Sequence, residues 1–183
     1  MIRVLVTGPQ GSGKTTQAQL LAGFLKVPFI GIGGDLRQRA QQGDEIAGKI
    51  KLSLDRGDLV DDKVVADFAK ERMAQSDCQN GFVIDGYPRS EEQVKLFNPD
   101  YTKVFYLEIS DEEVLYRLLA RGREDDTPEL IKERLRIYHQ ETEPILKDYQ
   151  EQGVLEVVDG SLSILQVQDK IRHLINVRQV VNG

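Results

Sequence analysis

The fold is decided by the stretch IRVLVTGPQGSGKT, residues 2–15. A short run rich in β-branched residues ends at Gly8, and apolar residues then recur at helical spacing between positions 14 and 25. The first run is typical of a strand buried on both faces of a parallel sheet, and the second predicts an amphipathic helix. A strand, a glycine-rich turn and a helix are therefore expected to follow one another directly.

Residues 8–15 match the pattern G-x-x-x-x-G-K-[S/T] in the strand-to-helix context where this phosphate-binding loop belongs. Successive backbone N–H groups can face an anion there, and the helix adds the positive end of its dipole. Lys14 can reach the β- and γ-phosphates of a nucleotide, and the hydroxyl of either Thr15 or Thr16 can coordinate Mg²⁺. The residues of this loop expected to bind ATP are Gly11, Ser12, Gly13, Lys14, Thr15 and Thr16.

Strand-like and helical patterns alternate along the rest of the chain. Further short apolar runs occupy residues 28–30, 82–84, 104–107 and 154–158. Helical patterns cover residues 36–54, 64–73, 112–120, 128–149 and 164–177. This order predicts an α/β fold of P-loop NTPase type, a doubly wound five-stranded parallel sheet flanked by helices, with ligands beyond the carboxyl ends of the strands.

Length and composition narrow the class of protein. With 183 residues, 40% of them hydrophobic, the chain is expected to form a single domain over residues 1–183. A net charge of −6 disfavours a protein that binds the nucleic-acid backbone. The single cysteine, Cys78, and an apolar start too short for a signal peptide or a membrane span favour the cytoplasm. We expect a cytoplasmic monomer that binds neither nucleic acid nor membranes.

The segment DGYPR, residues 85–89, carries a second group of chemically useful side chains. Asp85 ends an expected strand near the phosphates, so its carboxylate can hold Mg²⁺ or its waters, with a helix or turn cap as the alternative interpretation. Arg89 offers a planar fork suited to phosphate oxygens. Gln93 carries a donor and an acceptor and could pair with a purine edge, although exposed helical glutamines are common.

A third group of residues surrounds the short charged segment 122–127. Thr127 and Pro128 make a good helix start, and Asp125 and Asp126 could either cap that helix or fix Arg123. Phosphoryl transfer depends mainly on positioning and charge stabilisation, for which a set of arginines is well suited. Taken singly, each arginine could equally form a surface salt bridge worth less than about 1 kcal/mol. The arginines concerned are Arg117, Arg121, Arg123 and Arg134.

Together these three groups of residues resemble the adenylate kinase family of nucleoside monophosphate kinases, in its short-lid form, along essentially the whole chain. The resemblance implies transfer of the γ-phosphoryl group of ATP to AMP, giving two ADP, with Mg²⁺ as cofactor. It also implies that residues 30–62 form a helical insertion that binds the acceptor nucleotide, and that residues 122–127 form a short lid.

The resemblance assigns a role to each candidate residue. Arg117 is similar to a residue that packs on the donor adenine, and Arg121 also belongs to the ATP site. The implied catalytic residues are Lys14, Arg89, Arg121, Arg123 and Arg134. The implied AMP-binding residues are Gly33, Arg37, Leu59, Val60, Gly86, Arg89, Gln93, Arg123 and Arg134. The implied metal ligands, direct or through water, are Thr15 and Asp85.

Some positions depart from the family pattern. Ile32 and Gly34 stand where the family has a threonine and an aspartate in the acceptor pocket, and Asp61 replaces a proline. Loss of the threonine hydroxyl removes a polar contact with the acceptor base. The sequence therefore leaves open a kinase for another monophosphate such as CMP, UMP or dAMP, a small-metabolite kinase, or a P-loop ATP-binding assembly factor with weak catalysis.

Overall fold

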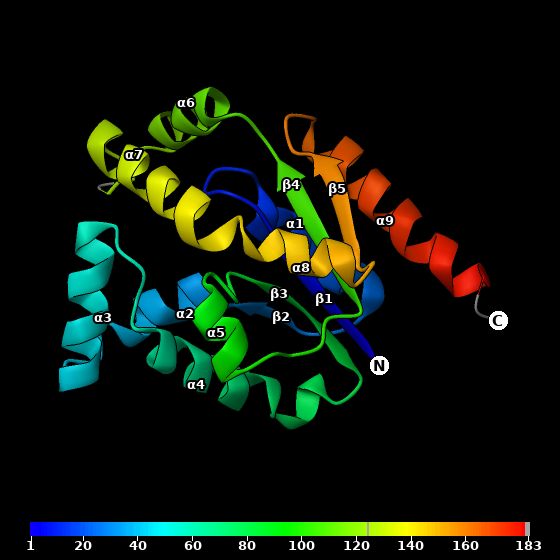
Figure 1. Ribbon diagram of the computed structural model, residues 1–183, viewed down its shortest axis with the longest axis horizontal. Helices are drawn as coiled ribbons and strands as arrows, with labels where there is room; N and C mark the ends of the chain where they lie inside the picture. The colour runs from blue at the N-terminus through cyan, green and yellow to red at the C-terminus, as the bar shows by residue number, and fades with distance from the viewer. Residues whose placement is uncertain (124, 182–183) are drawn as a thin grey trace.

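The computed structural model describes residues 1–123 and 125–181, with side chains up to Ile175. Its centre is a sheet of five parallel strands in the order β2-β3-β1-β4-β5 (Figure 1). The expected α/β fold with a five-stranded parallel sheet is confirmed. The strands are β1 (Ile2–Thr7), β2 (Phe29–Gly31), β3 (Gly81–Asp85), β4 (Lys103–Glu108) and β5 (Leu155–Asp159).

Helices cover both faces of this sheet (Figure 1). Helices α1 and α9 pack together against one face, and the remaining core lies on the other face and beside it. The helices are α1 (Lys14–Leu25), α2 (Ile32–Arg39), α3 (Glu45–Arg56), α4 (Asp62–Met73), α5 (Glu91–Leu96), α6 (Asp111–Arg121), α7 (Pro128–Ile137), α8 (Ile145–Glu151) and α9 (Ile164–Val181). A 3₁₀ turn, Ser76–Cys78, and a π-helical turn, Tyr138–Thr142, complete the set.

Strand β1 is apolar without alternation because both of its faces are buried. Val4 and Val6 pack into the cluster beneath α1 and α9, while Leu5 packs into the cluster on the opposite face. All three side chains are at most 2% exposed. Successive side chains of a strand point to opposite faces, so a central parallel strand needs a continuous apolar run.

The strand register places the chemically useful residues at one edge. Val6 pairs with Asp85 on one side of β3, and Gly31 pairs with Asp85 on the other. The carboxyl ends of β1, β2 and β3 therefore meet, and the loop that begins at Gly8 leaves the sheet beside Asp85. This is the edge at which doubly wound sheets bind their ligands.

The prediction of a single helix over residues 36–54 is wrong, because the structure has two helices there, α2 and α3. Gly43 adopts a positive φ of 81°, and Asp44 is the N-cap of α3. Asp44 Oδ1 accepts a hydrogen bond from Ala47 N at 2.8 Å, and its carboxylate also binds Arg39 at 3.1 and 2.8 Å. Helix α2 has already ended at Arg39; the turn through Gly43 then separates it from α3, which the aspartate cap starts.

The long helix expected over residues 128–149 is also interrupted. Helix α7 ends at Ile137, a π-helical turn follows, and α8 begins at Ile145. Pro144 has no backbone N–H, so the helical hydrogen-bond ladder cannot pass through it. Glu143 N instead bonds back to Tyr138 O at 2.9 Å, which is the π-type spacing. Helix α5, with six residues, is too short to show a helical period and was not predicted from the sequence.

Candidate active site

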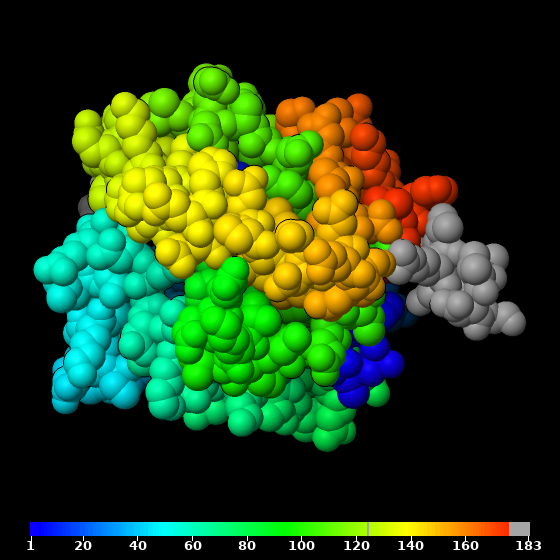
Figure 2. Space-filling model, viewed as in Figure 1, coloured from blue at the N-terminus to red at the C-terminus, as the bar shows by residue number. Residues whose placement is uncertain are grey.

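A cleft of about 610 Å³ runs along the carboxyl edge of the sheet. Every residue expected at the site lines this cleft except Ser12, which is 3% exposed and lies inside the phosphate-binding loop. The end of α3 meets α7 across the cleft, since a Cβ added to Gly57 would lie 3.4 Å from a side-chain carbon of Leu130. Figure 2 shows the α7 region lying against the α3 region on this face.

The phosphate-binding loop is held tightly against the sheet. Gly8 has a φ of 148°, and a Cβ there would lie 2.7 Å from the carbonyl oxygen of Leu107 on β4. The loop ends at Gly13, and α1 starts at Lys14. The backbone N–H groups of the loop and the N-terminus of α1 can therefore face the same anion.

Lys14 extends back over this loop, and its Nζ donates to Pro9 O at 3.1 Å. Desolvation lowers the pKa of Lys14 to about 8; the nearby Asp85 opposes this shift, whereas Arg89, Arg121 and Arg37 add to it. A lysine ringed by arginines lacks enough negative charge around it, so an anionic ligand would restore its usual pKa.

Thr15 and Asp85 are brought together from α1 and β3. The Thr15 hydroxyl donates a hydrogen bond to Asp85 Oδ2. Asp85 is 6% exposed, and its other oxygen, Oδ1, is buried without a hydrogen-bond partner among the described residues. A free carboxylate oxygen beside a hydroxyl is a donor set that Mg²⁺ accepts, so these residues fit the implied metal.

Arg89 and Arg37 bring two buried or half-buried cations to the cleft. Burial lowers the pKa of Arg89, with Asp85 opposing the shift and Arg134 adding to it. Burial likewise lowers the pKa of Arg37, and the largest neighbouring contribution comes from Arg123. Arg89 Nε donates to Gly86 O at 3.1 Å, which fixes the base of its guanidinium. Like charges gathered around one cleft make an anion-binding site.

Gln93 is buried rather than exposed on a helix. The residue is 1% exposed, and its Oε1 accepts a hydrogen bond from Arg89 N at 2.8 Å. Its Nε2 donates to Oδ1 of Asp62, which the sequence did not single out. This contact depends on α4 packing against α5, and no local pattern in the sequence signals it.

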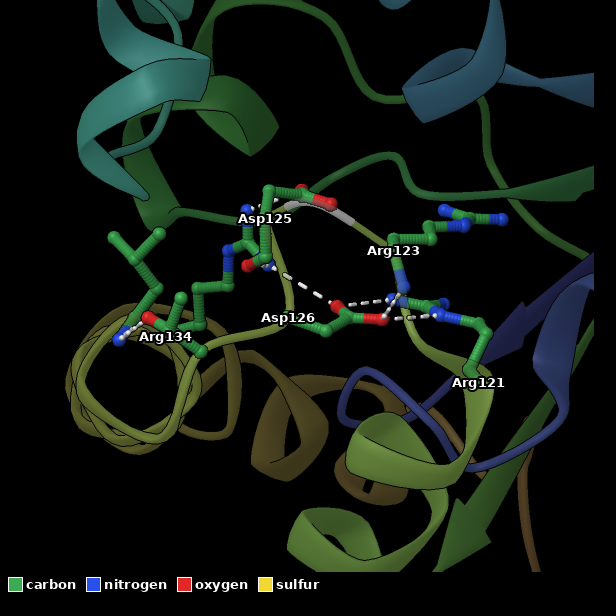
Figure 3. Close-up of polar contacts among 7 residues, drawn as sticks. Arg121, Arg123, Asp125, Asp126 and Arg134 are labelled. Atoms are coloured by element: carbon green, nitrogen blue, oxygen red, sulfur yellow. Dashed lines mark hydrogen bonds and ion pairs between the residues drawn. The ribbon is translucent and has the colours of Figure 1, made fainter.

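The acidic pair of the predicted lid binds arginines (Figure 3). Asp126 accepts two hydrogen bonds from Arg121: Nε donates to Oδ2 at 2.8 Å and Nη2 donates to Oδ1 at 2.7 Å. Asp125 holds Arg134 at 2.6 Å, and Arg134 also lies 3.7 Å from Asp126. Arg123 contacts Asp126 only through its backbone N–H, which donates to Oδ2. Its side chain points away from both acids in Figure 3.

The helix after the lid is capped by Thr127, whose Oγ1 accepts a hydrogen bond from Leu130 N at 3.3 Å. The structure thus assigns the helix cap to the threonine and the arginine contacts to the acids. The predicted lid, residues 122–127, includes Glu124, which lies outside the described residues.

Arg117, which lines the cleft, is held by three contacts. Its Nε donates to Glu113 Oε1 at 2.7 Å, while its Nη1 and Nη2 reach the carbonyl oxygens of Gly160 at 2.9 Å and Ser161 at 3.3 Å. The guanidinium thus links α6 to the loop after β5. Such a held, planar group can stack on a nucleotide base.

Within residues 1–123 and 125–181, no helix is both long and apolar enough for a membrane span. Over the same residues, there is no group of three or more His, Cys, Asp or Glu side chains arranged to hold a metal ion.

Comparison with known proteins identifies the family. A sequence model described as adenylate kinase matches residues 6–154. The chain is 37% identical to the adenylate kinase of Trichodesmium erythraeum over 184 residues, covering 94% of this chain and 96% of that one. It is 37% identical to adenylate kinase 1 of Nostoc sp. over 180 residues, with the same coverage, and 38% identical to the adenylate kinase of Micrococcus luteus over 182 residues, covering 93% and 89%. The matches span nearly the full length of each protein, and the chain therefore belongs to the adenylate kinase family of phosphotransferases.

Proposed function

We propose that this chain transfers the γ-phosphoryl group of ATP to AMP, giving two molecules of ADP, with the residue roles set out below. The observation that carries the proposal is the convergence of four separate segments in one cleft. The phosphate-binding loop follows β1, Asp85 ends β3, and the arginines come from α2, the loop after β3 and the α6–α7 region. This combination suits two phosphorylated ligands that meet between cations.

The donor phosphates bind at the loop between Gly8 and Lys14. Backbone N–H groups and the start of α1 face the phosphates, and the Lys14 ammonium contacts the β- and γ-phosphates. Thr15 and Asp85 would hold Mg²⁺, directly or through water, which when bound neutralises part of the phosphate charge. The hydrogen bond between Thr15 and Asp85 favours Thr15 over Thr16 as the hydroxyl concerned. Arg117 packs against the donor base.

The acceptor monophosphate binds on the opposite side of the cleft, against the insertion of residues 30–62. Arg37 and Arg89 hold its phosphate, and the apolar side chains of Leu59 and Val60 lie beside its base. Gly33 and Gly86 allow the Arg89 guanidinium to approach, because a Cβ on either would lie 3.2 or 3.1 Å from Arg89 Nη2.

The chemistry requires no general base, since a phosphate oxygen of the acceptor is already an anionic nucleophile. Lys14, Arg89, Arg121, Arg123 and Arg134 surround the transferring group and stabilise the charge spread over its oxygens. The short lid, residues 122–127, excludes water and so suppresses hydrolysis of ATP. We assign the protein to the cytoplasm as a monomer, in keeping with its single cysteine; light scattering of the purified chain tests the monomer.

The test is a coupled assay of ADP formation from ATP and Mg²⁺, with AMP, CMP, UMP, GMP and dAMP offered separately. AMP should support the fastest turnover, and Lys14→Ala should abolish it. If only another monophosphate supports turnover, that monophosphate is the acceptor in place of AMP. ATP binding without transfer to any monophosphate would reject the proposal in favour of a nucleotide-binding scaffold.

A further inference from the structure

Asp62, the first residue of α4, contacts the side chain that faces the acceptor base. Its Oδ1 accepts hydrogen bonds from Gln93 Nε2 at 2.9 Å and from Ser90 Oγ at 2.8 Å. Gln93 lines the cleft, whereas Asp62 does not. Any effect of Asp62 on a ligand in the cleft must therefore pass through Gln93.

The amide of Gln93 is held in one orientation by partners that cannot exchange roles. Its Oε1 faces the backbone N–H of Arg89 at 2.8 Å, and a backbone N–H can only donate. Its Nε2 faces the Asp62 carboxylate, which can only accept when ionised. Rotating the amide by half a turn would set donor against donor and acceptor against acceptor.

Neither the neighbouring hydroxyl nor water relieves that mismatch. Ser90 donates its hydroxyl hydrogen to Asp62, and its oxygen accepts from the backbone N–H of Gln93 at 3.1 Å. Ser90 is 3% exposed and Gln93 is 1% exposed, so away from the side that lines the cleft no solvent replaces a lost partner. A buried polar group left unsatisfied is costly, and the observed orientation is fixed.

A fixed amide distinguishes two kinds of purine. Gln93 keeps one hydrogen on Nε2 and one lone pair on Oε1 for a ligand. Adenine presents a donor at its 6-amino group beside an acceptor at N1, whereas a 6-oxopurine presents an acceptor at O6 beside a donor at N1. In one pose of the base, the amide can match only one of these two orders, and a mismatch leaves both groups unpaired.

Two positions of the acceptor pocket that could carry a polar side chain do not. Ile32 is 1% exposed and packs into the core, and Gly34 has no side chain. Leu59 and Val60 bring apolar side chains to the cleft. Within the group Asp62, Ser90 and Gln93, only Gln93 lines the cleft, and its amide presents both a donor and an acceptor there.

We propose that Asp62 is a positioning residue for acceptor specificity: by locking the Gln93 amide, it makes the pocket accept a 6-aminopurine monophosphate and reject a 6-oxopurine monophosphate. The inference rests on the proposed function, because it takes the acceptor base to lie against Gln93. Its test uses AMP and IMP, two monophosphates whose bases differ at position 6 and in the protonation of N1.

The experiment measures dissociation constants for AMP and IMP by calorimetry, and kcat and KM for each with ATP and Mg²⁺. The wild-type chain should prefer AMP by at least about tenfold. Asp62→Asn, which can donate as well as accept, should reduce that preference about tenfold or more while the KM for ATP changes less than about twofold. Asp62→Glu keeps a carboxylate and should retain part of the preference.

Two further variants separate positioning from a general structural effect. Asp67→Asn changes an exposed carboxylate of the same helix, paired only with Lys63 in the described chain, and should leave the AMP preference unchanged. In a Gln93→Ala background, adding Asp62→Asn should change the preference no further, because Asp62 acts only through Gln93.

Several results would overturn the inference: no preference for AMP in the wild type, an unchanged preference in Asp62→Asn, or an equal loss of AMP and IMP binding. If Asp62→Asn fails to fold, Asp62→Glu decides, because a fully unchanged preference in that variant would also overturn the inference. A wild-type chain that binds AMP in preference to IMP, loses that preference in Asp62→Asn, but forms no ADP would refute the proposed function and support the inference.

Discussion

Arg121 and Asp126 form a two-point ion pair at the entrance to the cleft, with contacts of 2.8 and 2.7 Å. The Asp126 side chain is fully buried, and its Oδ1 also lies 3.7 Å from Nη1 of Arg134. One carboxylate therefore lies between two arginines that the proposed mechanism assigns to the phosphates. Without nucleotide, this acid limits the repulsion between cations that would otherwise face each other.

Asp126→Asn should lower the free energy of unfolding by about 1–3 kcal/mol, because it leaves buried charged donors with a weaker partner. The hydrogen bond from Arg121 holds the pKa of Asp126 below its ordinary value of 3.8. The contribution is therefore complete above that value and is lost as the pH falls through the lowered pKa of the folded protein.

Urea unfolding of Asp126→Asn and wild type between pH 3 and 8 checks this prediction. The difference should be constant above about pH 5 and shrink below about pH 4. Asp67→Asn, which removes an exposed charge, should stay within about 0.5 kcal/mol of wild type. A deficit that grows as the pH falls would contradict the assignment.

Lys14 gives the ATP site a predicted dependence on pH. Desolvation lowers the pKa of its ammonium to about 8 in the nucleotide-free protein, so a rise in pH through that value removes the charge that contacts the phosphates. The KM for ATP should be constant below about pH 7.5 and rise by up to about tenfold per pH unit above about 8.5. Lys14→Arg, which stays charged, should remove this dependence. Equal KM values at pH 7 and 9.5 in the wild type would show that Lys14 keeps its proton.

Thr15 and Thr16 should differ in their effect on the metal. Thr15 bonds to Asp85, whose second oxygen has no partner among the described residues. Thr15→Val should raise the Mg²⁺ concentration for half-maximal activity by about tenfold or more. Thr16→Val, an equal change in shape, should leave it within about twofold. The reverse result, measured as activity against free Mg²⁺ at saturating ATP, would move the metal to Thr16.

Gly33 and Gly34 are adjacent in α2 and make a matched pair. A Cβ at Gly33 would lie 3.2 Å from Arg89 Nη2, whereas one at Gly34 would meet nothing within 4 Å. Gly33→Ala should displace the Arg89 guanidinium by a few tenths of an ångström and raise the KM for AMP about 3- to 10-fold, with little change for ATP.

Gly34→Ala should leave both KM values unchanged. Neither glycine has a positive φ, so alanine should preserve or slightly raise the stability of α2 in both variants. Initial-rate kinetics at varied AMP, together with thermal melts, compares the pair. Equal KM values for AMP in the two variants would show that Arg89 does not depend on the space at Gly33.

Much of the site could be read from local sequence because its parts are local motifs. The loop of residues 8–15, with its strand and helix, needs only contiguous residues to form, and its neighbours fix its conformation. Asp85, Arg89 and the arginines of α6 and α7 were recognised by type and spacing, and they line one cleft in the structure. Helix boundaries were less certain, since Gly43 and Pro144 interrupt patterns that otherwise continue.

The sequence by itself determined the five strands, the phosphate-binding loop and the family, because each depends on residues close together in the chain. Only the tertiary structure decided which carboxylate pairs with which cation and amide. Asp126 with Arg121, Thr15 with Asp85 and Asp62 with Gln93 are chosen by how α1, β3, α4 and α5 pack and by how the lid folds. Side-chain partners from different elements depend on where those elements meet in space, and no local pattern of residues carries that information.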